Sequence, residues 1–399
     1  MSLLDIAPII EQMLLVSDNI SDLNFSANQK PQVEINGKLH PASPLGLGRL
    51  TAFQTETIAM SLVRDNPDAA MQLAKYRTAD LSYALPGKCR FRVNIFQQRN
   101  SWSIVMRLIP HSIPSFEDLR LPPTLAEIAE IRNGIVLLTG PTGSGKSSTL
   151  AAIIDRINET KAYHIVTIED PIEFLHNHKM STINQREVGA DTRDFATALR
   201  AALRQAPKVI LVGEMRDLET IEMALRIAET GHLTFATLHT NSAYSTINRI
   251  IDVFPSEQQA QVRTQLSLVL EGILCQSLLP KASGDGRAMA LEILVPNSAI
   301  RNLIREDKIH QIYSMMQTGQ DKFGMQTFNQ ALATLVHKRT ITLEVAMQRS
   351  SNPDELKELI QRGSGLNESY GGVGRPAAPP AGGSPYAQGR PIGQRPPVR

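Results

Sequence analysis

A glycine-rich segment has the residue types and spacing that bind a nucleotide phosphate. Residues 140–147 read GPTGSGKS, which fits the pattern G-x-x-x-x-G-K-[ST] between a run typical of a buried strand and the start of a helix. Glycines let the backbone curl until its N–H groups point at phosphate oxygens, and the helix N-terminus adds a favourable dipole. Lys146 is expected to neutralise the β- and γ-phosphates of ATP, and Ser147 to bind Mg²⁺. The predicted nucleotide-binding residues are Gly140, Pro141, Thr142, Gly143, Ser144, Gly145, Lys146, Ser147 and Ser148.

Three acidic side chains follow predicted strands and are candidates for chemistry at that loop. Glu214 follows VILVG (209–213), and a carboxylate at the carboxyl end of a strand lies close to the phosphate loop. Glu214 is therefore expected to hold Mg²⁺, partly through water, or to orient the attacking water. Glu169 and Glu173 lie in TIEDPIEF (167–174) and compete with Glu214 for the role of general base. Each acid has a plain structural or solvated alternative, and the residues alone do not decide between them.

Histidines stand at both ends of the predicted strand LTFATL (233–238). His239 is at the carboxyl end, the edge where phosphates bind, and is expected to sense the γ-phosphate. His232 is at the other end, where a hydrogen-bonded structural role is as well supported as a catalytic one. His176 and His178 form half of a metal-binding pattern, but no further ligands stand nearby, so a surface loop is the better interpretation.

Buried strands alternate with helices in the part of the chain that carries these residues. Strands are predicted at 134–139, 164–168, 209–213 and 233–238, with a helix starting at Lys146 and another ending before Pro207. This alternation is typical of a parallel sheet covered by helices on both faces, which places the chain in the α/β class. Residues 256–279 and 297–361 are predicted to be predominantly helical.

The N-terminal part is predicted to be a separate α+β module. A helix is expected over 3–15, a hairpin over 32–39 that turns on Asn36-Gly37, and a strand pair at 89–96 and 102–109. Four prolines between 110 and 123 suit an interdomain connection because proline breaks both helix and strand. The Gly/Pro/Arg-rich end of the chain is predicted to be disordered.

Composition excludes several classes of protein. The 399 residues are 42% hydrophobic with a net charge of +2, enough for a buried core and too little positive charge for a binder that neutralises nucleic-acid phosphates. The two cysteines are far apart and predict neither a disulfide framework nor a zinc site. No uncharged apolar run is long enough to cross a bilayer, so we expect no direct membrane insertion and a cytoplasmic location.

Taken together, the motifs resemble those of the PilT family of pilus-retraction ATPases within the secretion ATPase superfamily. The resemblance includes the phosphate loop, TIEDPIEF (167–174), LVGEMRDLETIEMAL (211–225), GHLTFATLHTNSA (231–243) and AIRNLIRE (299–306). The last segment is similar to the signature associated with retraction and consists of Ala299, Ile300, Arg301, Asn302, Leu303, Ile304, Arg305 and the following glutamate.

The resemblance implies a fold, an assembly and further site residues. It implies a PAS-like α+β N-terminal domain (1–112), a linker (113–123), a RecA-like P-loop ATPase domain with C-terminal helices (124–366) and a disordered tail (367–399). It also implies a homohexamer whose ATP sites are shared between subunits, with Arg92 and Arg107 presented to the nucleotide, where a guanidinium suits transition-state phosphate charge. The implied partner is the inner-membrane pilus platform protein, at the cytoplasmic base of the pilus machine.

Two alternatives to a principal retraction motor stay open. A pilus assembly or type II secretion ATPase of the PilB or GspE type commonly carries a four-cysteine metal-binding insertion, which this chain lacks. A PilU-like accessory ring component that docks on a second PilT-like ATPase would keep the same motifs, so the sequence does not separate it from a principal motor.

Overall fold

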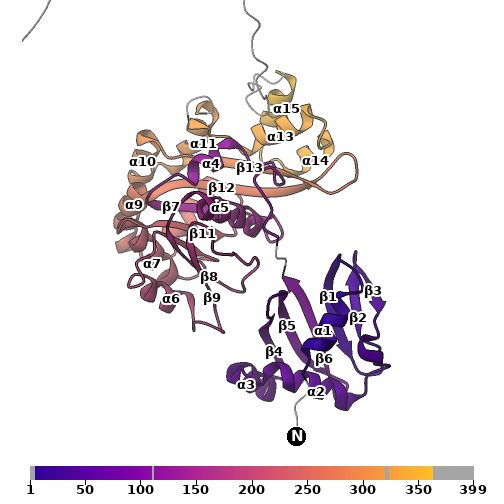
Figure 1. Cartoon of the computed structure of the whole chain (residues 1–399). Coiled ribbons are helices and arrows are strands. Elements are labelled where there is room, and N and C mark those ends of the chain that lie inside the picture. The colour runs from indigo at the N-terminus through magenta and orange to yellow at the C-terminus, as the bar shows by residue number, and fades with distance from the viewer. Residues whose placement is uncertain (1–4, 110–111, 320–322, 363–399) are drawn as a thin grey trace, which may run out of the picture. The chain divides into compact units, whose positions relative to one another are not determined.

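The computed structural model describes residues 5–109, 112–319 and 323–362, and these form two sheets with their covering helices (Figure 1). One sheet is built within residues 20–109 and the other within residues 134–294. Residues 112–122 between them contain no helix or strand. The tail predicted for 367–399 lies outside the described residues, and the exact domain boundaries remain a prediction.

The N-terminal sheet has six strands in the order β3-β2-β1-β6-β5-β4, and all neighbours are antiparallel. This is the α+β arrangement predicted for this part of the chain, although β1 and β4 had not been predicted. Its elements are α1 (Ala7–Leu14), β1 (Ile20–Ser26), β2 (Gln32–Ile35), β3 (Lys38–Pro41), η1 (Pro44–Gly46), α2 (Ala52–Val63), α3 (Pro67–Tyr76), β4 (Thr78–Leu85), β5 (Cys89–Gln98) and β6 (Ser101–Ile109).

Side-chain alternation explains why this sheet has one buried face. In β5, Phe91, Val93 and Ile95 are fully buried in one hydrophobic cluster with residues of α1, α2 and α3, and the residues between them face the other side. The predicted hairpin is confirmed: Asn36 and Gly37 have φ values of 52° and 74° between β2 and β3, the conformation that a two-residue turn requires.

The second sheet has seven strands in the order β13-β12-β7-β11-β10-β8-β9. All neighbours are parallel except β12 and β13. Its elements are α4 (Pro123–Ile128), β7 (Gly134–Thr139), α5 (Lys146–Thr160), β8 (His164–Glu169), β9 (Thr182–Glu187), α6 (Phe195–Ala202), β10 (Val209–Val212), α7 (Leu218–Glu229), β11 (Leu233–Leu238), α8 (Ala243–Asp252), α9 (Ser256–Val269), β12 (Leu270–Pro280), β13 (Arg287–Leu294) and α10 (Ser298–Arg305).

Helices cover both faces of this sheet, as predicted. Ile135 and Leu137 of β7 belong to a cluster with residues of α6 to α10, whereas Val136 and Leu138 belong to a second cluster with residues of α4 and α5. Alternate residues of one strand point to opposite faces, so β7 is buried throughout and almost entirely apolar because helices cover both of its faces. The predicted α/β fold class is confirmed.

The prediction of helix from 256 to 279 is wrong in its second half, because α9 ends at Val269 and β12 begins at Leu270. β12 lies between β7 and β13 and buries side chains on both faces, so its apolar run has no alternation that distinguishes a strand from a helix. The later segment is helical as predicted. It contains η2 (Ile309–Gln311), α11 (Ile312–Thr318), α13 (Phe328–His337), α14 (Leu343–Arg349) and α15 (Pro353–Gln361).

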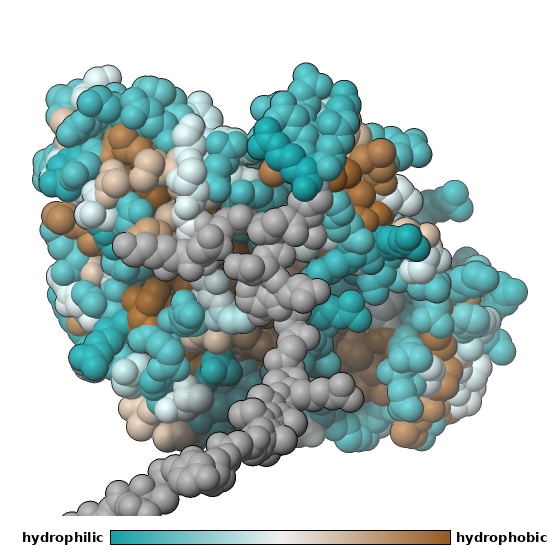
Figure 2. Space-filling view, turned by 90° about the horizontal axis from the view of Figure 1, so that it is seen from above, coloured by the Kyte–Doolittle hydropathy of each residue, from teal (hydrophilic) through white to brown (hydrophobic). Residues whose placement is uncertain are grey.

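The surface seen from above is mostly hydrophilic with scattered hydrophobic residues (Figure 2). Single exposed apolar side chains are normal on a folded protein. Within the described residues, no helix combines the length and the apolar character that crossing a bilayer requires.

Candidate functional site

Most of the residues predicted for the phosphate site meet at one edge of the second sheet. Parallel strands bring their carboxyl ends together, so the segments that follow β7, β8, β10 and β11 surround a single pocket. Its lining includes residues 142–148 of the glycine-rich loop, Glu169, Glu173, Glu214 and His239. The parallel order of the strands therefore places residues from four separate segments of the chain around the loop.

The loop has the geometry of a phosphate cradle. Gly140, Gly143 and Gly145 all have positive φ, at 139°, 77° and 87°. The first turn of α5 has no side-chain cap at its N-terminus, so its N–H groups remain available to an anion. The hydroxyl oxygen of Ser144 is also buried without a protein partner. These features fit the β- and γ-phosphates of a nucleotide.

Lys146 lies within this cradle and is only 9% exposed. Its Nζ donates hydrogen bonds to the carbonyl oxygens of Gly140 (2.8 Å) and Pro141 (3.2 Å), so the ammonium group lies across the start of the loop. Burial lowers the pKa of Lys146, and the negative charges of Glu214 and Glu173 partly oppose that effect. A partly desolvated cation at this position attracts phosphate more strongly than one in water.

Glu214 is held by two basic side chains. Its Oε1 accepts a hydrogen bond from Arg216 Nε and lies 2.9 Å from Nε2 of His239. Burial raises the pKa of Glu214, but the hydrogen bonds and positive charges of Arg216 and His239 outweigh it, and the pKa lies below its ordinary value of 4.5. The side chain is 18% exposed. Glu214 is thus an ionised carboxylate that His239 and Arg216 orient at the pocket.

Glu169 and Glu173 have different surroundings. Oε1 of Glu169 accepts hydrogen bonds from Thr167 Oγ1 (2.6 Å) and Gln185 Nε2 (3.1 Å). Burial raises the pKa of Glu169 above its ordinary value of 4.5 despite these bonds. Glu173 is exposed at the lip of the pocket. The three acids therefore differ in both exposure and partners.

The oxygen donors in this pocket fit Mg²⁺. Ser147 and Glu214 both line it, and Mg²⁺ takes hard oxygen ligands while keeping several waters, so it needs few protein ligands.

His178, one half of the predicted histidine pair, accepts a hydrogen bond at Nδ1 from the backbone N–H of Ile183 (3.1 Å). Among the residues that the structure describes, no group of three or more His, Cys, Asp or Glu side chains is arranged to hold a metal ion.

His176 lies on a loop as expected, but its side chain is partly buried instead of fully at the surface. Gln185 of β9 accepts from the backbone N–H of His176 and donates to the carbonyl of Phe174, which folds the segment inward. His176 lines the pocket, and burial lowers its pKa to about 4. The imidazole is therefore neutral near pH 7. His178, by contrast, is exposed as expected.

His232 and the AIRNLIRE segment lie apart from the pocket lining. His232 is at the opposite end of β11 from His239, and its Nδ1 contacts the carbonyl oxygen of Ile227 and the hydroxyl of Thr230, both at 3.1 Å. In α10, Ile300 and Ile304 are buried in the core, Leu303 is partly buried, and Ala299, Asn302 and Arg305 are exposed.

Arg301 bridges α10 to the end of α9. Its Nη1 donates to the carbonyl oxygens of Ser267 (2.9 Å) and Leu268 (3.1 Å), and its Nη2 pairs with Glu271 (2.9 Å). Arg301 therefore satisfies carbonyls at the C-terminus of α9, whereas Arg305 donates a hydrogen bond to Asn302 of its own helix.

Arg92 and Arg107 belong to the N-terminal sheet. They are paired residues on the neighbouring strands β5 and β6, and both side chains are exposed. Arg107 Nε donates to Oδ1 of Asp22 at 3.0 Å.

Sequence reasoning missed several residues near the loop. Arg216 is two residues after Glu214, and its place in the EMRD segment was an available signal. Gln276 and Arg287 come from β12 and β13, where no motif points to them. Arg287 Nη1 lies 3.4 Å from the carbonyl oxygen of Gly143, and Gln276 contacts both the loop and α5.

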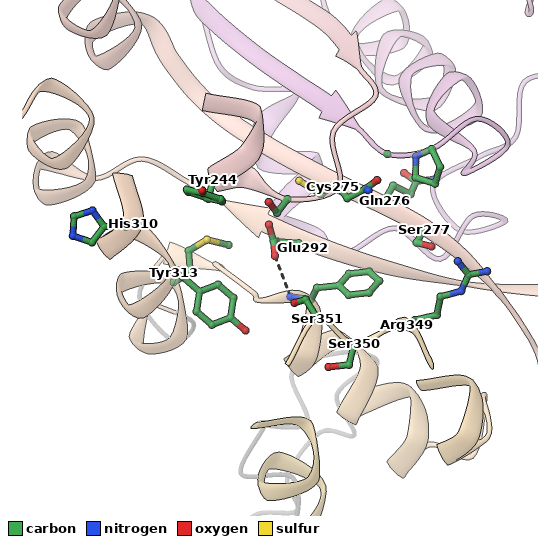
Figure 3. A pocket seen from close by; sticks show the side chains of 16 residues that line it. Tyr244, Cys275, Gln276, Ser277, Glu292, His310, Tyr313, Arg349, Ser350 and Ser351 are labelled. Carbon is green, nitrogen blue, oxygen red and sulfur yellow. Dashed lines mark hydrogen bonds between the residues drawn. The ribbon is translucent and has the colours of Figure 1, made fainter. Parts of the chain in front are cut away.

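A second cavity, of about 760 Å³, lies beside the start of the loop, between Gly140, Pro141 and the helices α11 and α13 (Figure 3). Glu292 of β13 is 3% exposed at its wall. Its Oε1 accepts from the N–H of Ala243 (2.6 Å) and its Oε2 from the N–H of Phe328 (3.4 Å). One carboxylate therefore stabilises the N-termini of both α8 and α13.

Known proteins are similar to this chain over most of its length. The family model of the Type II/IV secretion system protein matches residues 78–360. The type IV pilus retraction ATPase PilT of Pseudomonas aeruginosa is 46% identical over 334 residues, which cover 84% of this chain and 95% of that protein. The twitching motility protein of Neisseria gonorrhoeae is 47% identical over 326 residues, covering 82% of this chain and 86% of that protein.

A second pilus ATPase and a solved structure extend the comparison. The type IV pilus ATPase PilU of Pseudomonas aeruginosa is 38% identical over 351 residues, covering 88% of this chain and 90% of that protein. The crystal structure of the pilus retraction motor PilT with bound ADP is 50% identical, with a TM-score of 0.80, and covers 89% of this chain and 99% of that one. The chain therefore belongs to the Type II/IV secretion system proteins and, among them, to the PilT family of type IV pilus retraction ATPases.

Proposed function

We propose that this protein is a motor that hydrolyses ATP at the 140–148 loop to power retraction of type IV pili. The observation that carries the proposal is the convergence of Lys146, Glu214 and His239 on one pocket beside a loop with phosphate-binding geometry. The identity to PilT and to the twitching motility protein, over most of each chain, supports the assignment to retraction.

Each residue of the pocket has its own proposed role in ATP binding and hydrolysis. Loop N–H groups and Lys146 bind the β- and γ-phosphates, and Ser147 and Glu214 would hold Mg²⁺, which when bound neutralises phosphate charge. The partly buried, ionised Glu214 orients the attacking water, with His239 holding the carboxylate. Glu169 is a weaker candidate for the base because its carboxylate is already bound by Thr167 and Gln185. Glu173 is exposed and remains a candidate at the lip of the pocket.

The site is proposed to be shared between subunits of a homohexamer. Arg92 and Arg107 of one subunit would reach the nucleotide of the next, where a guanidinium stabilises developing phosphate charge. ATP binding and release would then move one domain against the other at the 113–123 linker. Successive movements around the ring would act on the inner-membrane pilus platform protein from the cytoplasm, at the base of the pilus machine, where a second PilT- or PilU-like ATPase would be a further partner.

A principal motor is favoured over a PilU-like accessory. The chain is 46% identical to PilT and 38% identical to PilU of the same organism. The intact set of Lys146, Glu214 and His239 around the pocket also supports hydrolysis over a purely structural role.

ATPase activity and pilus retraction, measured for the same variants, test the proposal. Lys146→Ala and Glu214→Ala are expected to lose turnover and retraction, while the exposed Lys357→Ala and Glu56→Gln keep both. Equal ATPase activity in wild type, Lys146→Ala and Glu214→Ala would defeat the enzyme assignment. Lost turnover with normal retraction would instead indicate an accessory role.

A further inference from the structure

Gln276 of β12 lies beside the point where β7 enters the glycine-rich loop. Cys275 is in register with Thr139, the last residue of β7, so Gln276 stands level with Gly140. Gln276 is 3% exposed, and it lies next to Cys275 on the strand that borders the second cavity (Figure 3). A buried side-chain amide needs partners for both of its ends.

Both ends of the Gln276 amide are hydrogen-bonded to the nucleotide-binding segment. Nε2 donates to the carbonyl oxygen of Ser144 at 2.8 Å, and Oε1 accepts from the hydroxyl of Thr149 at 2.9 Å. The Ser144 carbonyl can only accept, which fixes the orientation of the amide. Thr149 is 1% exposed and stands in the first turns of α5. One side chain thus joins β12, the loop and the helix that follows it.

The space around the loop glycines reflects the same close contact between the loop and Gln276. A Cβ on Gly140 would lie 2.2 Å from the backbone oxygen of Gln276, and a Cβ on Gly145 would lie 2.9 Å from its Nε2. A Cβ on Gly143, in the middle of the loop, would meet nothing within 4 Å. The loop is therefore packed against Gln276 near its two ends, whereas a Cβ at Gly143 would point into open space.

We propose that Gln276 is a positioning residue that holds the loop backbone in its phosphate-binding conformation. Gln276 acts through the carbonyl of Ser144 and the hydroxyl of Thr149, and it need not touch the nucleotide. The inference rests on the proposed function, because it assumes that the loop binds phosphate. Loss of the amide would leave the Ser144 carbonyl buried without a donor, and the N–H groups of the loop would no longer be held in convergence.

The predicted consequence is weaker nucleotide binding by a folded protein. The unpaired buried carbonyl and the loosened loop should raise the dissociation constant for Mg·ADP by about tenfold to a hundredfold. ADP is the better probe because its binding does not depend on hydrolysis. Gln276→Leu removes both hydrogen bonds at similar volume. Gln276→Glu keeps an oxygen that accepts from Thr149, but it replaces the Nε2 donor with a carboxylate oxygen that faces the Ser144 carbonyl oxygen. Because two acceptors then repel each other, this variant should bind Mg·ADP at least as weakly as Gln276→Leu.

Two further variants keep the test informative if Gln276→Leu folds poorly. Thr149→Val removes only the bond to α5 and should weaken binding by a few fold. Gln330→Leu is the matched control, because Gln330 is another buried glutamine, 6% exposed, whose amide caps α13 through Thr327. Gln330→Leu should lower thermal stability and leave the dissociation constant unchanged.

Titration with a fluorescent ADP analogue, with Mg²⁺, separates positioning from a general loss of stability. A positioning role raises the dissociation constant at unchanged stoichiometry, whereas a merely structural role lowers the fraction of binding-competent protein at unchanged affinity. Affinity within about twofold of wild type in folded Gln276→Leu, or an equal loss in Gln330→Leu, would overturn the inference. Failure of the wild type itself to bind ADP or ATP would count against the proposed function instead.

Discussion

Arg92 and Arg107 lie directly opposite each other on the antiparallel strands β5 and β6, with both guanidinium groups on the exposed face of the sheet. Like charges opposite each other destabilise a sheet. Asp22, which is 4% exposed, compensates Arg107, and the structure describes no hydrogen bond or ion pair for Arg92. Arg107 is thus charge-compensated, and Arg92 is the one of the two whose charge suits an anionic ligand in the proposed shared site.

If these arginines complete the ATP site of a neighbouring subunit, inactive variants should complement each other. Arg92→Ala and Lys146→Ala are each expected to lose most ATPase activity, by about 10³-fold or more for an arginine that stabilises transition-state charge. Mixed rings contain some interfaces with an intact Arg92 on one side and an intact Lys146 on the other. ATPase assays over a series of mixing ratios should therefore show partial recovery.

The control for complementation is a mixture of two variants defective on the same side of the site. In a mixture of Lys146→Ala and Glu214→Ala, every subunit has a defect in its own pocket. One variant lacks the loop lysine and the other lacks the carboxylate, so no interface has a complete site. If no ratio of Arg92→Ala to Lys146→Ala restores ATPase activity, that result would argue against a site shared between subunits.

Alanine at two glycines of the loop should give unequal effects. Gly143→Ala meets no atom within 4 Å and bears only the strain of its φ of 77°, about 1–2 kcal/mol. Gly140→Ala would place its Cβ 2.2 Å from the backbone oxygen of Gln276, which cannot move without shifting β12. We expect Gly140→Ala to lose more stability in denaturant unfolding and to abolish Mg·ADP binding. Similar affinities in the two variants would contradict the packing described here.

Glu292 should make stability depend on pH. Burial raises its pKa above the ordinary 4.5, with the N–H groups of Ala243 and Phe328 partly opposing the shift. From about pH 4.5 up to the raised pKa, the folded protein keeps a proton that the unfolded chain has released. Stability therefore falls as pH rises through that window, by about 1.4 kcal/mol for each pKa unit of the shift.

Glu292→Gln should flatten this part of the stability curve. Thermal unfolding measured at several pH values above about 4.5 checks it. The exposed Glu56→Gln is the control and should leave the curve unchanged. Some slope should persist in Glu292→Gln because burial also raises the pKa of Glu169. If stability depends on pH with the same slope in Glu292→Gln as in wild type, the Glu292 carboxyl group is not the source of that pH dependence.

Substitution of the two arginines of the AIRNLIRE segment should distinguish a contribution to stability from a contribution to retraction. Arg301→Ala leaves the carbonyls at the end of α9 and the Glu271 carboxylate without their donor, and should cost roughly 2 kcal/mol of unfolding free energy. Arg305→Ala should change stability by less than about 0.5 kcal/mol because the side chain is exposed and its hydrogen bond goes to Asn302 on the same exposed side of α10.

Retraction in cells carrying each variant then distinguishes the two roles. Loss of retraction in a stable, ATPase-active Arg305→Ala protein would place a partner contact on the exposed side of α10. Normal retraction in that variant would restrict the contribution of the segment to packing through Arg301, Ile300 and Ile304.

The sequence sufficed for the loop and its flanking elements because their signals are local. The glycines and Lys146 stand at fixed spacing, and β7, β10 and β11 are short apolar runs bounded by polar residues. Their parallel arrangement follows from the alternation with helices, which places Glu214 and His239 at the same edge as the loop.

The rest of the site could not be predicted because it depends on long-range pairing. β12 is buried on both faces and its sequence does not alternate, so neither its contact with β7 nor the place of Gln276 follows from spacing. β9 carries polar residues at the edge of the sheet, and the inward fold of His176 depends on Gln185 in that strand. Both cases need the strand order, which single-sequence periodicity does not contain.

β12 also carries the attachment of the C-terminal helices. Three residues beyond Gln276, about 10 Å along the strand, Leu279 packs with Ala288 and Ala290 of β13 against α13, α14 and α15. β12 therefore contacts the glycine-rich loop at Gln276 and the C-terminal helices at Leu279. If the loop binds nucleotide as proposed, this strand is a short covalent connection between the surroundings of the nucleotide and the packing surface of those helices.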